Sequence, residues 1–323
     1  MSNGFYWKFS GKNMHEIFWV YEKDKSNQFK YDIILNNNDE FIQHKEKLGI
    51  NKDVTIEIFD IFNSYNNIIK QIKEPKSTPK FNKGGKLIVA LFEWRYRASP
   101  HWNSNGCMIT YLKWIINAIL KVYNSNEIGF ALIYGENNYK QIESSFSNWE
   151  NIVLIKTNDG SHNAHTYSKR LYTPELWEHF KPWKHVLVYQ WDALLLRQIP
   201  EKYFEYDYIG APIAGCPRSG GNGGFSLRNV EKTIEACEKY RGNYYNIHNI
   251  KEKIGHEDGY FGEGRDNFKY VKLHQDEHKE FAIESIHHDN PVGLHKVFQW
   301  YSIHRSGKEW LQLLENIKSK LLN

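Results

Sequence analysis

Short apolar runs alternate with helical stretches through the middle of the chain. KLIVALF, IGFALIY, NIVLI and HVLVYQ have the length and the apolar content of buried strands. Between the first two runs, apolar residues recur at helical spacing over Asn105–Tyr123. Because strands that alternate with helices are typical of βαβ units, the pattern predicts an α/β fold with a mostly parallel sheet. The predicted strands are Lys86–Phe92, Ile128–Tyr134, Asn151–Ile155 and His185–Gln190.

The pattern divides the chain into three parts. Residues 1–80 contain the strand-like runs YDIIL and VTIEIFDIF and a possible helix through Ile68 and Ile72, and they end in the polar, linker-like KEPKSTPKFNKGGK. No chemical motif occurs there, so we predict a small N-terminal extension or subdomain without assigning it a role. Residues 81–305 form the main domain, and residues 306–323 a C-terminal helix.

Composition excludes several classes of protein. The net charge of +4 comes without a dense Lys/Arg block, so nucleic acid is not an expected partner. No run approaches the roughly 20 apolar residues of a membrane span, and the opening MSNGFYWKFSGKN lacks the apolar core of a secretory signal, so we expect a cytoplasmic protein. Three cysteines without a CxxC pair argue against a disulfide framework or a cysteine zinc site.

Polar residues follow the predicted strands, at the sheet edge where α/β proteins bind ligands. Glu93 and Arg95 follow the first strand, and Asp192 the fourth. In the segment QWD, Asp192 is a candidate ligand for Mn²⁺ or Mg²⁺, which accept carboxylate, phosphate and water oxygens, with Gln190 and Trp191 beside it. Each of these residues also fits a loop or a helix cap.

Four glycines surround Asn222 ahead of an expected short strand, Phe225–Arg228; they are Gly220, Gly221, Gly223 and Gly224. Such a density lets the backbone approach a ligand closely or adopt positive φ. A strand rather than a helix follows, and no GK[ST] ending occurs, so the segment is neither a dinucleotide fingerprint nor a P-loop. We interpret it as a binding loop, with Asn222, Ser226 and Arg228 offering hydrogen bonds to sugar hydroxyls or phosphate.

Two further segments carry candidate chemistry. In GHEDGYF, Glu257 and Asp258 enter an expected short helix, whose N-terminus lowers a carboxylate's pKa and would keep a general base ionised. Simple complementation of the helix dipole is the alternative. In NPVGLHK, His295 is a possible Mn²⁺ ligand and Lys296 a possible partner of a departing diphosphate, although the nearby His287 and His288 fit such roles equally.

The chain resembles a family of glycosyltransferase-like domains first catalogued as a domain of unknown function. The resemblance rests on five motifs in this order: QWD, YDYIGAP, GGNGGFSLRN, HEDGYF and GLHK. The resemblance runs from about Leu87 to about Trp300 and includes YSKRLYTPELW. It implies a GT-A-like fold, with Asp192 as the last acid of a DxD metal motif and His295 as the late histidine of the metal site. Glu257 and Asp258 resemble the ED pair that contains the base of inverting members. Gln190 departs from the pattern, because it stands where the first acid of DxD would be.

These observations predict a hexosyltransferase-type enzyme that uses Mn²⁺ or Mg²⁺ and moves a sugar from a UDP- or GDP-sugar to a glycan or another acceptor. Asp258 and Glu257 are the candidate catalytic residues, and inversion follows if Asp258 is the base, while a retaining route stays open. The alternatives are a non-catalytic carbohydrate-binding module and a metal-dependent phosphoesterase. The candidate donor- and substrate-binding residues are Glu93, Arg95, Gln190, Trp191, Gly221, Asn222, Gly223, Gly224, Arg228 and Lys296.

Overall fold

The computed structural model describes residues 6–8, 18–21, 33–35, 68, 71–72, 77–94, 108–158, 164–213, 220–239, 256–262, 268–271, 275–284, 286–295 and 307–322. The chain divides into two compact units. The first comprises Met1–Glu74, Tyr96–Trp114 and Phe298–Asn323, and the second comprises Pro75–Arg95 and Ile115–Val297. All described candidate site residues belong to the second unit.

The first unit contains an antiparallel sheet of three strands in the order β1-β2-β3, namely β1 (Tyr6–Lys8), β2 (Phe18–Tyr21) and β3 (Ile33–Leu35). Strand β3 lies within the predicted YDIIL run, whereas residues 54–62 (VTIEIFDIF) lie outside the described residues. Helix α11 (Gly307–Leu322) falls in the segment for which a C-terminal helix is predicted, and it buries one apolar face.

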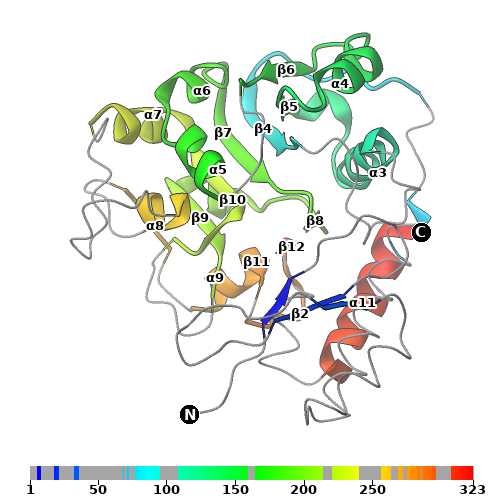
Figure 1. The fold of residues 1–323 in the computed structure, drawn as a ribbon. Helices are drawn as coiled ribbons and strands as arrows, with labels where there is room; N and C mark the ends of the chain where they lie inside the picture. The colour runs from blue at the N-terminus through cyan, green and yellow to red at the C-terminus, as the bar shows by residue number, and fades with distance from the viewer. Residues whose placement is uncertain are drawn as a thin grey trace. The chain divides into compact units, whose positions relative to one another are not determined.

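The second unit is built on a six-stranded sheet in the order β6-β5-β4-β7-β10-β9. Four neighbouring strands are parallel: β4 (Gly85–Phe92), β5 (Gly129–Tyr134), β6 (Val153–Lys156) and β7 (Trp183–Tyr189). Each coincides with a predicted apolar run to within a few residues. The predicted α/β fold with a mostly parallel central sheet is therefore confirmed (Figure 1).

Strand β10 (Asn222–Asn229) runs antiparallel to both β7 and β9 (Tyr208–Ala211). Its direction matters for the site. Phe225 pairs with Tyr189 at the carboxyl end of β7, so the glycine-rich start of β10 lies at the same sheet edge as the carboxyl ends of the parallel strands. The strand is longer than the expected Phe225–Arg228, because Asn222 and the two glycines after it belong to it.

Helices connect the strands and cover the sheet (Figure 1). The stretch predicted over Asn105–Tyr123 contains α3 (Met108–Leu120), after which a 3₁₀ turn, η2 (Ser125–Glu127), leads into β5. A second 3₁₀ turn, η3 (Glu201–Glu205), precedes β9. The other described helices of the second unit are α4 (Tyr139–Phe146), α5 (Ala164–Leu171), α6 (Pro174–Glu178), α7 (Val230–Lys239), α8 (Glu257–Gly262) and α9 (Asp276–Phe281).

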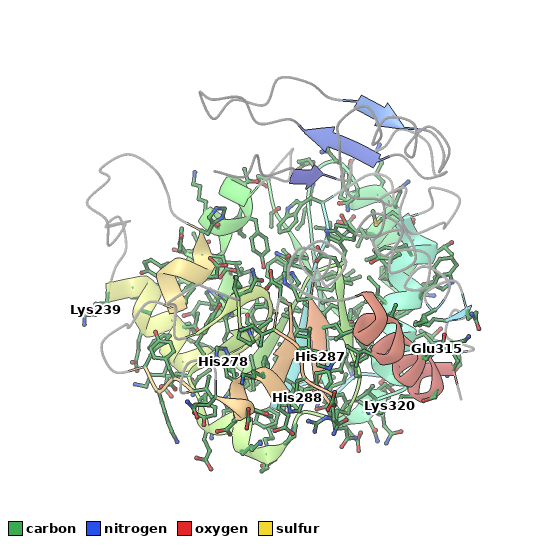
Figure 2. The ribbon with its side chains drawn as sticks, turned by 90° about the horizontal axis from the view of Figure 1, so that it is seen from below. Lys239, His278, His287, His288, Glu315 and Lys320 are labelled. Atoms are coloured by element: carbon green, nitrogen blue, oxygen red, sulfur yellow. The ribbon has the colours of Figure 1, made fainter. Side chains whose placement is uncertain are left out.

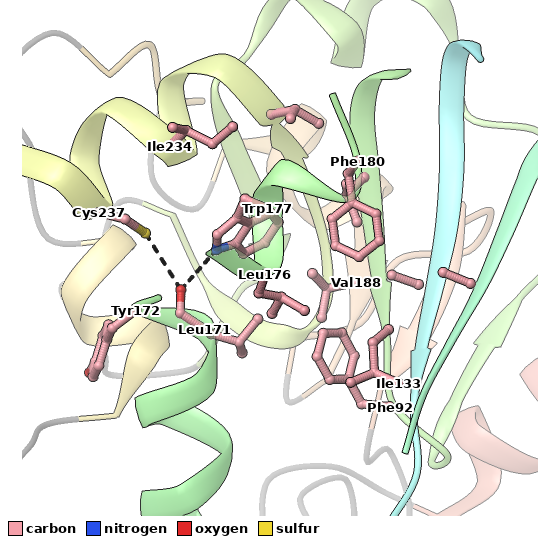
Figure 3. Packing of buried hydrophobic residues seen from close by; sticks show 14 of the residues in the cluster. Phe92, Ile133, Leu171, Tyr172, Leu176, Trp177, Phe180, Val188, Ile234 and Cys237 are labelled. Carbon is pink, nitrogen blue, oxygen red and sulfur yellow. Dashed lines mark hydrogen bonds between the residues drawn. The ribbon is translucent and has the colours of Figure 1, made fainter. Parts of the chain in front are cut away.

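One apolar core lies between the sheet and helices α5 to α8. Trp177 of α6 is fully buried, and its indole N–H donates to the carbonyl oxygen of Leu171 at 2.9 Å. The Cys237 thiol of α7 contacts the same oxygen at 3.7 Å (Figure 3). Burial raises the pKa of Cys237 to about 12, so this thiol is a packing residue rather than a nucleophile.

A second, smaller sheet has the order β11-β12-β8 and consists of β11 (Ala282–Ile283), β12 (Gly293–His295) and β8 (Ala193–Leu195). Strand β12 runs antiparallel to β8, with His295 opposite Ala193. Because Asp192 directly precedes Ala193, this register brings two residues about a hundred positions apart to one place.

None of the helices in the described part of the chain has both the length and the apolar character needed to cross a lipid bilayer.

Candidate functional site

The segment QWD forms a closed turn after β7. The N–H of Gln190 donates to the carbonyl oxygen of Gly224 on β10 at 2.8 Å, and the N–H of Ala193 donates to the Gln190 carbonyl at 3.0 Å. Asp192 is only 1% exposed, whereas Trp191 is half-buried. The turn therefore carries the Asp192 carboxylate into the interior, where a carboxylate costs free energy unless a compensating charge or hydrogen bond accompanies it.

His295 lies beside Asp192. Its Nε2 lies 3.5 Å from Asp192 Oδ1 and 3.1 Å from Gln190 Oε1, and the ring is fully buried. Two residues singled out from the sequence as metal ligands, Asp192 and His295, therefore lie side by side, with Gln190 against the same ring nitrogen.

Glu284, which sequence reasoning missed, completes the surroundings of this ring. It follows β11, is 1% exposed, and its Oε2 lies 3.3 Å from His295 Nδ1. Burial lowers the pKa of His295, but the carboxylates of Glu284 and Asp192 outweigh burial and raise it. The signal in the sequence was an acid directly after the short apolar run FAI, the same strand-then-acid pattern that drew attention to Asp192.

Gly223 and Gly224 lie inside β10 rather than in a loop ahead of it. A Cβ atom on Gly223 would overlap the Glu257 carboxylate, and one on Gly224 would overlap His295 Nε2 and lie 2.6 Å from Gln190 Oε1. The close approach expected of these glycines is therefore made by the protein's own side chains. Their lack of side chains gives Glu257 and His295 room against the strand.

Gly221 is the glycine of this segment that needs its conformational freedom. Its φ is +76°, a region that residues with a side chain rarely adopt. The residue after it, Asn222, pairs with Ala211 of β9, and the pairing then shifts before Ser226, so the strand starts with a bulge. The expected binding loop is thus a kinked strand start at the edge of the site.

Arg228 and Glu257 form a buried ion pair. The Arg228 guanidinium donates to Glu257 Oε2 at 2.6 Å, and neither side chain is exposed by more than 5%. The guanidinium lies 4.9 Å from the ring centroid of Tyr208, 5.2 Å from Phe261 and 5.6 Å from Trp177. The structure therefore gives Arg228 a different role from the predicted phosphate contact, because its charge is enclosed by one carboxylate and three aromatic rings.

Glu257 also differs from the prediction. A helix N-terminus was expected to lower the pKa of this acidic pair, but burial raises the pKa of Glu257, and the Arg228 charge only partly offsets the effect. Asp258, its neighbour, is half-buried, and its Oδ2 lies 3.4 Å from the amide nitrogen of Asn222. The two adjacent acids thus occupy different environments, with Glu257 inside and Asp258 facing the start of β10.

The other predicted residues have local contacts or lie outside the described residues. Glu93 is buried at the carboxyl end of β4, where its N–H and carbonyl groups bond to β5 and to Asn138. Arg95 and Lys296 lie outside the described residues. His287 and His288, labelled in Figure 2, form local contacts with Asp289 and Asn290 in the turn before β12.

The donor atoms around His295 fit a divalent cation in part. Among the described residues, no group of three or more His, Cys, Asp or Glu side chains could hold a metal ion by itself. Asp192 and His295 alone supply one oxygen and one nitrogen at a separation compatible with a shared ion. A glutamate on the other ring nitrogen is the usual outer-shell partner of a metal-bound histidine.

One protein-family model matches part of the chain. The family model described as a protein of unknown function (DUF5672) matches residues 151–295, which include the QWD turn, β10, α8 and His295. No curated protein shows significant sequence similarity to the chain.

Solved structures of the glycosyltransferase GlyE from Streptococcus pneumoniae TIGR4 are similar to the chain at 12% sequence identity. One has a TM-score of 0.40 and covers 73% of this chain and 63% of its own. The apo form has a TM-score of 0.42 and covers 72% and 62%. The chain therefore spans under two thirds of the length of these structures.

Proposed function

We propose that this protein is a glycosyltransferase that moves a sugar from a nucleotide-sugar donor to a hydroxyl group of a glycan or another acceptor. Asp192 and His295 hold a divalent cation, Mn²⁺ or Mg²⁺, and Asp258 is the general base. The donor occupies the sheet edge that contains Glu93, Trp191 and the start of β10.

The observation that carries the proposal is the meeting of two acidic positions and one histidine at the carboxyl edge of a mostly parallel sheet. Asp192 and His295 come from separate segments and lie 3.5 Å apart, and Asp258 contacts Asn222 at the start of β10. This edge is where α/β sheets bind their ligands. A buried carboxylate beside a histidine suits a cation, and a half-exposed carboxylate suits a base that must reach an acceptor.

Each residue then has a separate task. A cation bound at Asp192 and His295 would supply Lewis-acid stabilisation of the leaving diphosphate. Asp258 accepts the proton of the acceptor hydroxyl as that oxygen attacks the anomeric carbon, and the sugar's bond to the diphosphate breaks. Asn222 hydrogen-bonds to the Asp258 carboxylate and holds it in place. A single displacement of this kind inverts the anomeric centre.

The test compares Asp192→Asn and Asp258→Asn with the wild type in a screen of UDP- and GDP-sugars with Mn²⁺. We expect nucleoside diphosphate release in the wild type. Asp192→Asn should weaken Mn²⁺-dependent donor binding, whereas Asp258→Asn should lower kcat by about 10²–10⁴-fold with little change in donor affinity. Asp276→Asn is the matched control, because Asp276 is an exposed acid that pairs with Lys279 in a surface contact of α9.

Donor binding without any release of nucleoside diphosphate, with or without acceptor, would instead indicate a binding module on a transferase-like fold. A product that retains the donor's anomeric configuration, measured by NMR, would remove the base role from Asp258. In that case Asp258 is an acceptor-binding or structural residue.

A further inference from the structure

The surroundings of His295 contain more electron-pair donors than a neutral imidazole can satisfy. Glu284 Oε2 lies 3.3 Å from Nδ1, and a carboxylate there accepts the Nδ1 proton. In the neutral ring, Nε2 then carries a lone pair. Facing that lone pair are Gln190 Oε1 at 3.1 Å and Asp192 Oδ1 at 3.5 Å, both of which are also electron-pair donors. Three such atoms repel one another unless a positive charge lies among them.

The Gln190 amide lies with its oxygen towards His295 Nε2, at 3.1 Å. An amide oxygen is a suitable ligand for Mn²⁺ or Mg²⁺, both of which bind oxygen donors.

The separations suit a common cation. Two ligands bound at about 2.1 Å and at right angles lie about 3.0 Å apart. The measured separations of Nε2 from Gln190 Oε1 and Asp192 Oδ1, 3.1 Å and 3.5 Å, are close to this value. Gly224 leaves the space open, because a Cβ there would meet both His295 Nε2 and Gln190 Oε1.

From these contacts we infer that Gln190 is the third protein ligand of the cation, through its amide oxygen, and that Glu284 is a positioning residue that fixes the His295 tautomer. The inference deepens the proposed function and rests on it for the identity of the ion. The sequence alone suggested that Gln190 contacts the donor or substrate. The inference assigns it to the cation instead.

The ligand set has a consequence for affinity. Asp192 is the only direct carboxylate, so the protein neutralises one of the two charges of the ion, where two acids would neutralise both. The free protein should therefore bind Mn²⁺ weakly, and a nucleoside diphosphate should tighten the binding because its oxygens supply the missing negative charge.

The experiment measures Mn²⁺ binding by electron paramagnetic resonance, with and without UDP or GDP, and needs no turnover. Gln190→Glu keeps the reach of the side chain and adds a charge, so we expect at least about tenfold tighter Mn²⁺ binding and a smaller effect of the nucleotide. Gln190→Leu should weaken binding, and Gln198→Leu, which changes an exposed glutamine, is the control. Glu284→Gln should cost about 10–100-fold in Mn²⁺ affinity.

A second readout tests Glu284 alone. The ¹⁵N shifts of His295 distinguish the Nδ1–H tautomer from the Nε2–H tautomer, and we expect Nδ1–H with Mg²⁺ bound in the wild type and a mixture in Glu284→Gln. Thermal unfolding of each variant checks that it is folded, and the conservative Gln190→Glu keeps the test informative if Gln190→Leu does not fold.

If the wild type binds Mn²⁺ and the Gln190 variants bind it equally well, the assignment of Gln190 is wrong and the proposed function stands. If the Glu284 variant keeps both the affinity and the tautomer, Glu284 does not position the ring. If the wild type binds nucleotide sugar but no Mn²⁺, the positive charge in the cluster is a proton on His295 and the inference fails. If it binds neither, the proposed function fails as well.

Discussion

The buried pair of Arg228 and Glu257 supports the sharpest stability prediction. Glu257→Gln keeps the shape of the side chain but removes its charge, which leaves the Arg228 guanidinium, 0% exposed, without a counter-charge. Breaking a buried pair by removing one partner typically costs about 3–5 kcal/mol. Because whole domains are stable by only about 5–15 kcal/mol, the variant should lose a large share of its stability.

The same reasoning predicts the behaviour of the double variant. Arg228→Met removes the charge and keeps an apolar stem among the rings of Tyr208, Phe261 and Trp177. Once both charges are gone, no buried charge is left unpaired. The double variant Arg228→Met/Glu257→Gln should therefore lose much less than the sum of the two single losses, with a coupling energy of several kcal/mol.

The assay is urea unfolding of the four proteins, with thermal unfolding as a check. A loss of about 3–5 kcal/mol corresponds to a fall in Tm of roughly 10 °C for a unit of this size. Lys232→Met and Glu235→Gln, from an exposed pair on α7, form the control cycle and should show a coupling below about 1 kcal/mol. A Glu257→Gln loss below about 1 kcal/mol, or additive single losses, would show that the enclosed charges are not what stabilises this part of the fold.

Three other changes have expected results. Gly224→Ala should lower Mn²⁺ affinity more than it lowers Tm, because its Cβ would displace His295; unchanged affinity in a folded variant contradicts this. Burial, with two nearby lysines, lowers the pKa of His185 to about 4. Between pH 6.5 and 4 the unfolded chain therefore binds more protons than the folded one, and the free energy of unfolding falls as the pH falls. His185→Leu should flatten this part of the curve of stability against pH, measured by urea unfolding. Burial raises the pKa of Glu280, but hydrogen bonds from a lysine, a tyrosine and an arginine outweigh burial and bring the pKa to about 2. The stabilisation by Glu280 is therefore present above its unfolded pKa of about 4.3 and is lost as the pH falls towards 2. Glu280→Gln should lower the free energy of unfolding by roughly 3 kcal/mol at pH 7 and should remove the part of the acid destabilisation that comes from this group.

The parallel strands could be predicted because each is a continuous apolar run, as expected for strands covered on both faces. Strand β10 could not be predicted in full. Glycine weakens a strand by its conformational freedom, so GGNGG is typical of a loop. In the structure, Gly223 and Gly224 are part of the strand because Glu257 and His295 occupy the volume that side chains would need. Those partners lie some thirty and seventy residues away, which no local pattern reveals.

For a similar reason, only part of the cluster around His295 could be predicted from the sequence. Asp192 and His295 stood out because they lie in recognisable short motifs, but their contact depends on the pairing of β12 with β8. Glu284 has no motif of its own, and its role follows only from the parallel pairing of β11 with β12, which places the residue after Ile283 beside the residue after Leu294. Sheet register, rather than residue type, selects this acid from the others of the chain.

The two adjacent acids of HEDGYF, Glu257 and Asp258, differ in burial, which the sequence alone does not indicate. Consecutive residues of a helix point about 100° apart, so neighbouring side chains can meet different surroundings. Glu257 points inward and is neutralised by Arg228, which makes it unavailable for proton transfer. Asp258 keeps partial exposure, and its Oδ2 lies 3.4 Å from the amide nitrogen of Asn222. A general base needs access to an acceptor, and of the pair Asp258 is the more exposed, which is why we propose it rather than Glu257 as the base.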